Sequence, residues 1–327
     1  MSMPETRQLS FSLAINEALH QAMAEDPRVI LVGQGVKSPW YVGNTATGLL
    51  EQFGPDRVID TPVSENAVTG AAVGAALAGM RPVVVHPRMD FMLYAFDPII
   101  NEAANWYYMS GGAMSVPVVF WGIINRGGEQ AAQHSQALHS IFSHIPGLKV
   151  VAPSCPADAK GLMVAAIRDD NPVVFVDERW LYRLEEAVPT GIYEVPIGKA
   201  RIVREGIDAT IACFSYLVLE AVAAAEILEG EGVNCEVLDM RTLRPLDREA
   251  LIASCHRTRR LVVCDVGWRT GGIGAEMVAL VAESGVGLAA PPCRVALPDS
   301  PAPAARTLER AYYPRSETIA AAVRGCL

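Results

Sequence analysis

Short, uninterrupted apolar runs alternate with longer amphipathic segments along this chain, and this alternation limits the folds that it can adopt. The runs are continuous in Val, Ile, Leu and Phe, as expected for strands that are covered on both faces. Helices between such strands make a parallel sheet. The pattern predicts strands at Arg28–Val32, Val58–Asp60, Pro82–His86, Pro117–Ile123, Leu148–Val151 and Pro172–Val176, with helices at Leu9–Ala24, Asn66–Ala78, Phe96–Met109 and Ala157–Arg168.

The same alternation starts again after a segment with a different composition. Residues 183–197 combine acidic side chains with prolines and a glycine, which is typical of a linker. The second set predicts strands at Ala209–Phe214, Asn234–Asp239, Arg260–Cys264 and Arg294–Leu297, with helices at Tyr216–Leu228, Arg248–His256, Ile273–Ala282 and Glu317–Arg324. We therefore expect an α/β protein with two doubly wound sheets: a domain over 1–185, a linker over 186–197 and a domain over 198–327.

Composition and charge exclude several classes of function. Of the 327 residues, 51% are hydrophobic and 19% are charged, and the net charge is −9 without a basic run. Nucleic acids and anionic membrane surfaces are therefore poor partners. No apolar stretch reaches the ~18 residues of a membrane span, and residues 1–10 carry no apolar signal core. We expect a cytoplasmic protein whose seven scattered cysteines are free thiols.

Glycine motifs that bind phosphates are incomplete in this sequence. Gly33-Gln34-Gly35 follows a predicted strand, but the third glycine of a dinucleotide fingerprint is replaced by Ser38. A nicotinamide dehydrogenase is therefore a weak alternative, and a simple turn explains the two glycines. The chain also lacks the GDG motif with a distant asparagine that holds Mg²⁺ and a diphosphate in thiamine enzymes.

The most informative segment reads DTPVSENAVTGAAVGAALAGMR over residues 60–81. It places Glu65 at the carboxyl end of a predicted strand and at the start of a helix. Ligand sites of α/β sheets form at this end of the strands. A carboxylate is also favoured at a helix start by the helix dipole alone. Position alone leaves both interpretations open.

This segment resembles the pattern DTPISE…G…AVGAAxAGxRPV of the β subunits of thiamine-diphosphate-dependent 2-oxo acid dehydrogenase E1 components. The resemblance continues in order along the chain, through NEAANWYYMSGG, AQHSQ, HIPGLKVV, DMRTLRPLD and RTGGIGAE. It implies a transketolase-like pyrimidine-binding domain followed by a transketolase C-terminal-type domain.

The resemblance also implies an activity and partners. A member of this family decarboxylates a 2-oxo acid with thiamine diphosphate and passes the acyl unit to lipoamide on an E2 core. An E1 α subunit holds the diphosphate and Mg²⁺, usually in an α2β2 tetramer. Two alternatives stay open, namely transfer of an acyl or ketol unit to a non-lipoyl acceptor, and a non-catalytic subunit that only scaffolds or regulates.

The resemblance assigns roles to individual residues. Glu65 would contact the pyrimidine N1′ atom, and Phe91 would pack against the pyrimidine ring. His134, in AQHSQ, would handle protons of thiamine-bound intermediates. Ordinary core packing of Phe91 and a solvated loop position of His134 are the alternatives. We expect His139 and His144 to be structural.

A potassium site is implied at one helix end. The matching residues, whose backbone carbonyls dominate such sites, are Val118, Ala166, Ile167, Asp169 and Asn171. An ordinary helix C-terminus before Pro172 is the alternative.

Departures from the family pattern gather near the expected site. Gln34, at a cofactor-binding position, replaces a glutamate linked to proton communication between active sites. Trp121 stands where relatives usually have Arg, and Asp265 stands where they have His or Glu. Arg88 and Arg126 could reshape the pocket, together with Trp121, for a larger or anionic oxo acid, since arginine recognises carboxylates.

Three consecutive aromatic residues, Trp106, Tyr107 and Tyr108, lie in one predicted helix. They point around the helix, so one core cannot bury them all. Aromatic side chains are enriched in the cores of interfaces. This helix is therefore predicted to contact another subunit.

Overall fold

The computed structural model describes residues 5–38, 41–127 and 129–327. The chain divides into two compact units. The first unit comprises Met1–Arg126 and Ile141–Ile197, and the second comprises Gly127–Ser140 and Gly198–Leu327. The second unit resumes at the residue where the second domain was predicted to begin. The sequence did not predict that residues 127–140 group with it.

The first unit is built on a parallel sheet in the order β6-β7-β5-β4-β2-β3. Its strands confirm the predictions made from the apolar runs, with ends that differ by up to two residues. They are β2 (Val29–Gly33), β3 (Val58–Asp60), β4 (Arg81–His86), β5 (Val119–Ile124), β6 (Lys149–Val151) and β7 (Val173–Glu178).

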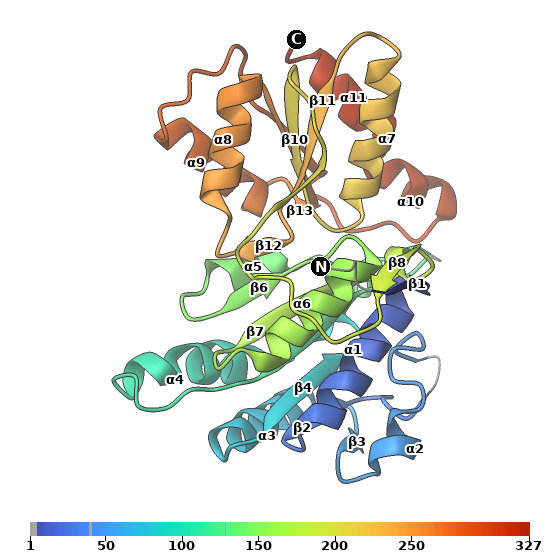
Figure 1. Ribbon diagram of the computed structural model, residues 1–327, viewed down its shortest axis with the longest axis vertical. Coiled ribbons are helices and arrows are strands. Elements are labelled where there is room, and N and C mark those ends of the chain that lie inside the picture. Colours follow the sequence, from blue (N-terminus) through green and yellow to red (C-terminus); the bar gives the residue numbers. More distant parts are fainter. Residues whose placement is uncertain (1–4, 39–40, 128) are drawn as a thin grey trace. The chain divides into compact units, whose positions relative to one another are not determined.

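Helices cover this sheet. They are α1 (Phe11–Glu25), α2 (Leu49–Phe53), α3 (Glu65–Leu77), η1 (Met89–Ala95), the π-helix η2 (Asp97–Ala103), α4 (Ala104–Met109), α5 (His139–His144), α6 (Pro156–Arg168) and η3 (Arg179–Leu181), and α5 begins in the sequence of the second unit. The helices α1 and α6 lie side by side (Figure 1). The buried Lys160 links them, because its Nζ donates to Glu17 at 2.5 Å and to the carbonyls of Pro189 and Gly191 at 2.7 Å.

A two-stranded antiparallel pair completes the first unit. The strand β1 (Thr6–Ser10) pairs with β8 (Glu185–Pro189). The predicted linker over residues 183–197 therefore contains the strand β8 in its first part. Its acidic residues and Pro189 conceal it, because a two-stranded edge needs no continuous apolar run.

The second unit contains a sheet in the order β14-β13-β10-β11-β9, parallel except for the antiparallel β9. Figure 1 shows α7 and α11 on one face of the sheet, and α8 and α9 on the other. The strands are β9 (Arg201–Arg204), β10 (Ala209–Cys213), β11 (Cys235–Asp239), β12 (Thr242–Arg244), β13 (Leu261–Trp268) and β14 (Cys293–Leu297), and the helices are α7 (Leu217–Glu229), α8 (Arg248–Thr258), α9 (Ile273–Glu283), α10 (Arg306–Tyr312) and α11 (Ser316–Arg324).

Two expectations from composition can be compared with the structure. The cysteines are free thiols, and all except Cys293 are buried. Burial raises the pKa of the Cys255 thiol to about 12, which keeps it protonated at neutral pH. Across the described ranges, no helix has both the length and the apolar character needed to cross a membrane.

Candidate functional site

Three of the predicted site residues of the first unit lie at the carboxyl edge of its sheet. The strands β2 and β4 are neighbours, with β3 on the far side of β2 and β5 on the far side of β4. The chain therefore continues from β2 toward one edge of the sheet and from β4 toward the other edge. Ligands of open α/β sheets bind in the crevice at such a point. Gln34 directly follows β2, Phe91 follows β4, and Glu65 begins the helix after β3.

Glu65 is the first residue of α3 and is half-buried. The Ala- and Gly-rich helix packs closely against β4 and η1, which fixes its start at the sheet edge. Within the described residues, the Glu65 carboxylate makes no hydrogen bond or ion pair. It is therefore available to a ligand.

Gln34 lies in the loop after β2, and two polar contacts hold this loop. Its Nε2 donates to the Tyr41 hydroxyl at 2.9 Å, and the Gly35 amide donates to Asp60 at 2.8 Å. Gly35 has a φ of +74°, and an added Cβ would lie 2.1 Å from the Tyr41 ring. Only glycine fits there, so the glycines shape this loop without the fingerprint of a dinucleotide site.

Phe91 and Arg88 follow β4. Phe91 lies in η1 and is partly exposed, as is Arg88, whose guanidinium donates to the Pro87 carbonyl at 2.8 Å. Burial lowers the pKa of Arg88, and the neighbouring Arg179 lowers it further. The end of the same strand carries His86, a buried residue whose pKa burial lowers to about 4.

Trp121 lies in the core of the first unit instead of on an open pocket wall. Its side chain is fully buried, and its Nε1 donates to Asp177 at 3.1 Å. The Tyr182 hydroxyl donates to the same carboxylate at 2.7 Å. Burial raises the pKa of Asp177 to about 6, against the lowering effect of these two hydrogen bonds. Any influence of Trp121 on substrate choice would therefore act through Asp177.

Arg126 is buried as well. Its Nε lies 3.6 Å from Oε1 of Glu178, and both side chains are inaccessible to solvent. The carboxylate compensates the charge of the guanidinium, as buried charges require. In the described chain, Arg126 thus faces a carboxylate of the protein, and its role toward a substrate stays a prediction.

His134 belongs to the second unit, in the segment 127–140. It is half-buried. Close to it in sequence, His139 is completely buried, and its Nε2 donates to Asp265 at 2.9 Å. From the sequence, His139 is expected to be structural, and Asp265 is only a departure from the family pattern. The signal that could have joined them is a lone aspartate directly after the apolar run 261–264.

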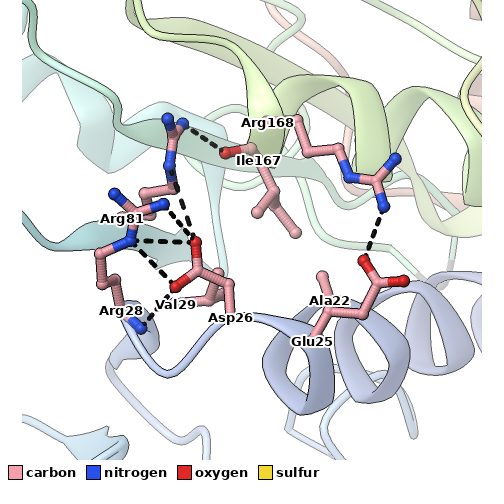
Figure 2. A pocket seen from close by; sticks show the side chains of 8 residues that line it. All are labelled: Ala22, Glu25, Asp26, Arg28, Val29, Arg81, Ile167 and Arg168. Carbon is pink, nitrogen blue, oxygen red and sulfur yellow. Dashed lines mark hydrogen bonds and ion pairs between the residues drawn. The ribbon is translucent and has the colours of Figure 1, made fainter.

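The predicted potassium ligands already have partners in the protein. Arg81 donates to the carbonyl of Ile167 at 3.1 Å and to that of Asp169 at 3.0 Å, and the Asp169 carboxylate pairs with Lys149. Figure 2 shows Arg81 reaching the Ile167 carbonyl from β4. A carbonyl oxygen keeps a second lone pair. These carbonyls can each accept a second contact, but the Arg81 charge beside them opposes a cation, and the potassium site stays a prediction.

A hollow of about 430 Å³ lies next to these residues, at the amino ends of β2 and β4 (Figure 2). Its arginines are compensated by carboxylates: Arg28 pairs with Asp26 at 2.7 Å, and Arg168 pairs with Glu25 at 2.6 Å. The hollow therefore offers little net charge to an anion. It also lies at the strand ends opposite to the predicted site.

Comparisons with known proteins agree along nearly the whole chain. Residues 7–185 match the family "Transketolase, pyrimidine binding domain", and residues 198–319 match "Transketolase, C-terminal domain". The acetoin:2,6-dichlorophenolindophenol oxidoreductase subunit beta of Cupriavidus necator is 45% identical over 97% of this chain and 97% of that protein. The pyruvate dehydrogenase E1 component subunit beta of Rickettsia conorii is 44% identical over 97% of this chain and 98% of that protein. The chain belongs to the family of 2-oxo acid dehydrogenase E1 β subunits.

A solved structure supports the fold of this E1 β family member. The split gene transketolase, an inactive beta4 tetramer, has a TM-score of 0.80 and 22% sequence identity, and the match covers 98% of each chain. This structure confirms the predicted fold class, and the sequence matches confirm the predicted family. The roles of individual site residues stay predictions.

Proposed function

We propose that this chain is the β subunit of a thiamine-diphosphate-dependent enzyme that decarboxylates a 2-oxo acid and passes the acyl unit to lipoamide. One observation carries the proposal. Glu65 presents a carboxylate that has no hydrogen-bond or ion-pair partner among residues 5–38, 41–127 and 129–327, and it lies at the start of α3, at the edge where α/β sheets bind ligands. The relatives whose names include pyruvate dehydrogenase E1 support the reaction class.

The residues of this chain fit the pyrimidine half of the cofactor. When bound, thiamine diphosphate supplies the carbon nucleophile and accepts the electrons released by decarboxylation. Glu65 would hold the hydrogen bond to the pyrimidine N1′ atom, and Phe91 would pack against the ring. Gln34 would line the same edge. His134 would hold or move a proton at the substrate.

The other half of the cofactor needs a partner in this proposal. We assign the diphosphate and Mg²⁺ to an E1 α subunit in an α2β2 tetramer, and the acyl acceptor to a lipoyl-bearing E2. The end of α4 would contact another subunit, because Tyr107, Tyr108 and Met109 are 49%, 88% and 61% exposed. Large apolar side chains gathered on a surface mark such contacts. The cytoplasmic location predicted from the sequence is part of the same proposal.

The test uses this chain assembled with its α subunit. Glu65→Gln should lower oxo-acid decarboxylation by about 10²–10⁴-fold, the usual contribution of proton transfer. Glu51→Gln is the matched control, since Glu51 also lies in the first turn of a helix of the same unit but is exposed. Unchanged turnover in Glu65→Gln would refute the catalytic role and favour a scaffold or regulatory subunit.

A second candidate function differs in its substrate and acceptor. The relative named for acetoin and dichlorophenolindophenol is as similar as the pyruvate dehydrogenase subunits. Offering pyruvate, a branched oxo acid and acetoin, each with a lipoyl domain or an artificial acceptor, separates the candidates. Product formation with the artificial acceptor but not with the lipoyl domain would favour the non-lipoyl acceptor. Unchanged substrate preference in Arg88→Ala and Arg126→Ala would exclude both arginines from specificity.

A potassium ion at Val118, Ala166, Ile167, Asp169 and Asn171 is also part of the proposal. The carbonyls of Ile167 and Asp169 retain acceptor capacity beside Arg81. Thermal unfolding in KCl and in NaCl of equal ionic strength tests this site. A higher melting temperature in KCl supports it, and identical temperatures contradict it.

A further inference from the structure

A buried carboxylate in the second unit holds three hydrogen-bond donors. Asp265 lies within β13, at the point where the pairing of this strand with β14 shifts register between Cys264 and Trp268. Its carboxylate accepts from His139 Nε2 at 2.9 Å, from the Gly267 amide at 2.8 Å and from the Gly274 amide at 2.9 Å. Burial raises the pKa of Asp265, but His139 and the amides outweigh it and hold the pKa below the ordinary value.

The surrounding backbone leaves room only for this arrangement. A Cβ on Gly272 would lie 2.6 Å from Oδ2 of Asp265, and a Cβ on Gly267 would lie 3.0 Å from the His139 ring. The imidazole also meets the Phe214 ring edge-on, with centroids 5.1 Å apart. The ring of His139 is therefore fixed in orientation as well as in position.

The segment that ends at His139 is fixed at both ends within the second unit. At its end, the Ser140 Oγ accepts from the Ile273 amide at 3.1 Å, so residues 139 and 140 both attach near the N-terminus of α9. At its beginning, the Glu129 amide donates to Glu309 at 3.4 Å. His134 lies between these two anchors.

The segment is also held in an unfavourable backbone conformation. Glu129 and Ala131 have φ values of 64° and 59°, in the left-handed region that side chains other than glycine rarely adopt. Such residues persist only where the surrounding structure enforces them. The contacts with Glu309 and Asp265 hold the two ends of the segment in this conformation.

We propose that His139 and Asp265 form a positioning pair, which orders residues 129–138 and thereby fixes His134 for its role at the substrate. The pair acts through His134 and touches no reactant itself. The catalytic consequence rests on the proposed function, whereas the ordering of the segment does not.

Hydrogen exchange of the full chain tests the ordering directly. In Asp265→Asn and His139→Leu, amides of residues 129–138 should exchange about tenfold faster or more, because a hydrogen bond to a charged group is lost. His139→Gln keeps a donor near the Nε2 position and should stay within about threefold of the wild type. Asp299→Asn is the control, since this exposed carboxylate also accepts two hydrogen bonds, both from Thr270.

Protection of β10 and β11 shows whether each variant remains folded. If both strands stay protected and exchange at 129–138 is unchanged in Asp265→Asn and His139→Leu, the pair only caps α9 and the proposal is wrong. Equal acceleration in His139→Gln and His139→Leu would also overturn it, because ring packing would then order the segment.

The assembled enzyme tests the consequence for catalysis. His139→Leu should lower kcat more than it raises the KM for the oxo acid, since His134 is present but no longer held. His139→Gln should restore kcat. Hydrogen exchange requires no substrate. If the variants exchange faster at residues 129–138 but the assembled wild-type enzyme has no activity, the proposed function is wrong and the positioning pair is still supported.

Discussion

Each unit buries a carboxylate almost completely, but the two acids have opposite preferences for the proton. Asp177 in the first unit is 0% exposed, and burial raises its pKa to about 6. Asp265 in the second unit is 2% exposed, and its pKa lies below the ordinary value. Both carboxylates follow apolar residues in a central parallel strand, so burial alone does not explain the difference.

The difference lies in the donors. Asp177 receives hydrogen bonds from two neutral side chains, those of Trp121 and Tyr182, and the Arg179 charge and the Glu178 amide also lower its pKa, but burial outweighs all of them. Asp265 receives the imidazole of His139 and two backbone amides, of which Gly274 lies in the first turn of α9. Backbone amides, a helix dipole and a basic ring stabilise an anion more than two neutral side chains do. The second unit therefore keeps a buried carboxylate charged well below neutral pH, whereas the buried carboxyl group of the first unit takes up its proton near pH 6.

The largest effect should follow from removing the buried charge. Asp265→Ala leaves His139 and the amides of Gly267 and Gly274 without their acceptor. We expect a loss of about 3–5 kcal/mol in the free energy of unfolding of the second unit, as for other broken buried pairs. Chemical denaturation, monitored by hydrogen exchange of the amides in β13, measures this loss.

A double-mutant cycle sharpens this expectation. If His139 and Asp265 act as one unit, the double variant His139→Ala/Asp265→Ala should cost much less than the sum of the single variants. Additive losses would show that the two side chains stabilise the fold independently.

The raised pKa of Asp177 should make the stability of the first unit depend on pH. The folded pKa of Asp177 is raised, so the stability that it contributes is present below pH ~4 and is lost as the pH rises through about 6. The loss is on the order of 3 kcal/mol between these limits. Asp177→Asn does not titrate, so its stability relative to the wild type should increase from pH 4 to pH 7.

His86 makes a comparison with the wild type at each pH necessary. Burial lowers its pKa to about 4, so its contribution to stability increases as the pH rises toward ~6.5, opposite to that of Asp177. The difference between Asp177→Asn and the wild type cancels this background. A difference that stays constant from pH 4 to pH 7 would mean that Asp177 keeps an ordinary pKa.

The fold could be predicted where its signal is local. Continuous apolar runs predict Val58–Asp60 with the observed bounds and the other strands of the first sheet to within two residues, whereas β13 ends at Trp268, four residues beyond the predicted end at Cys264. The pair β1–β8 and the grouping of residues 127–140 with the second unit depend on partners far along the chain. No periodicity within a short window encodes such pairings.

The candidate site divides in the same way. The position of Glu65 at the start of α3 could be predicted because the preceding strand and the Ala- and Gly-rich helix are visible in the sequence, while its role at the site stays a prediction. The contact between His139 and Asp265 joins residues 126 positions apart, and their spacing carries no signal. The indole of Trp121 lies in the core and donates to Asp177, 56 positions away, and its role near a substrate stays a prediction.

Two glycines extend the comparison of the units at smaller energies. A Cβ on Gly272 would meet the Trp268 carbonyl at 2.5 Å and Asp265 at 2.6 Å, which cannot both move. A Cβ on Gly122 would meet the Met92 sulfur at 2.6 Å, at the end of a flexible side chain. We expect Gly272→Ala to cost about 2–3 kcal/mol and Gly122→Ala about 1 kcal/mol in denaturation experiments. Equal costs would mean that the second unit adapts as easily as the first.

The smallest expected effect comes from one hydroxyl of the first unit. Tyr182→Phe removes a donor to Asp177 with little change in volume and should cost about 1 kcal/mol at pH 5, where the acid is largely neutral. At pH 8 the carboxylate is ionised, and the same change should cost roughly 2 kcal/mol, since hydrogen bonds to charged groups are stronger. Tyr193→Phe is the control, because its hydroxyl donates to the Ala157 carbonyl and should show the same cost at both pH values. If Tyr182→Phe is equally insensitive to pH, donors do not control the ionisation of Asp177. The contrast with Asp265 would then have to come from the helix dipole and His139 alone.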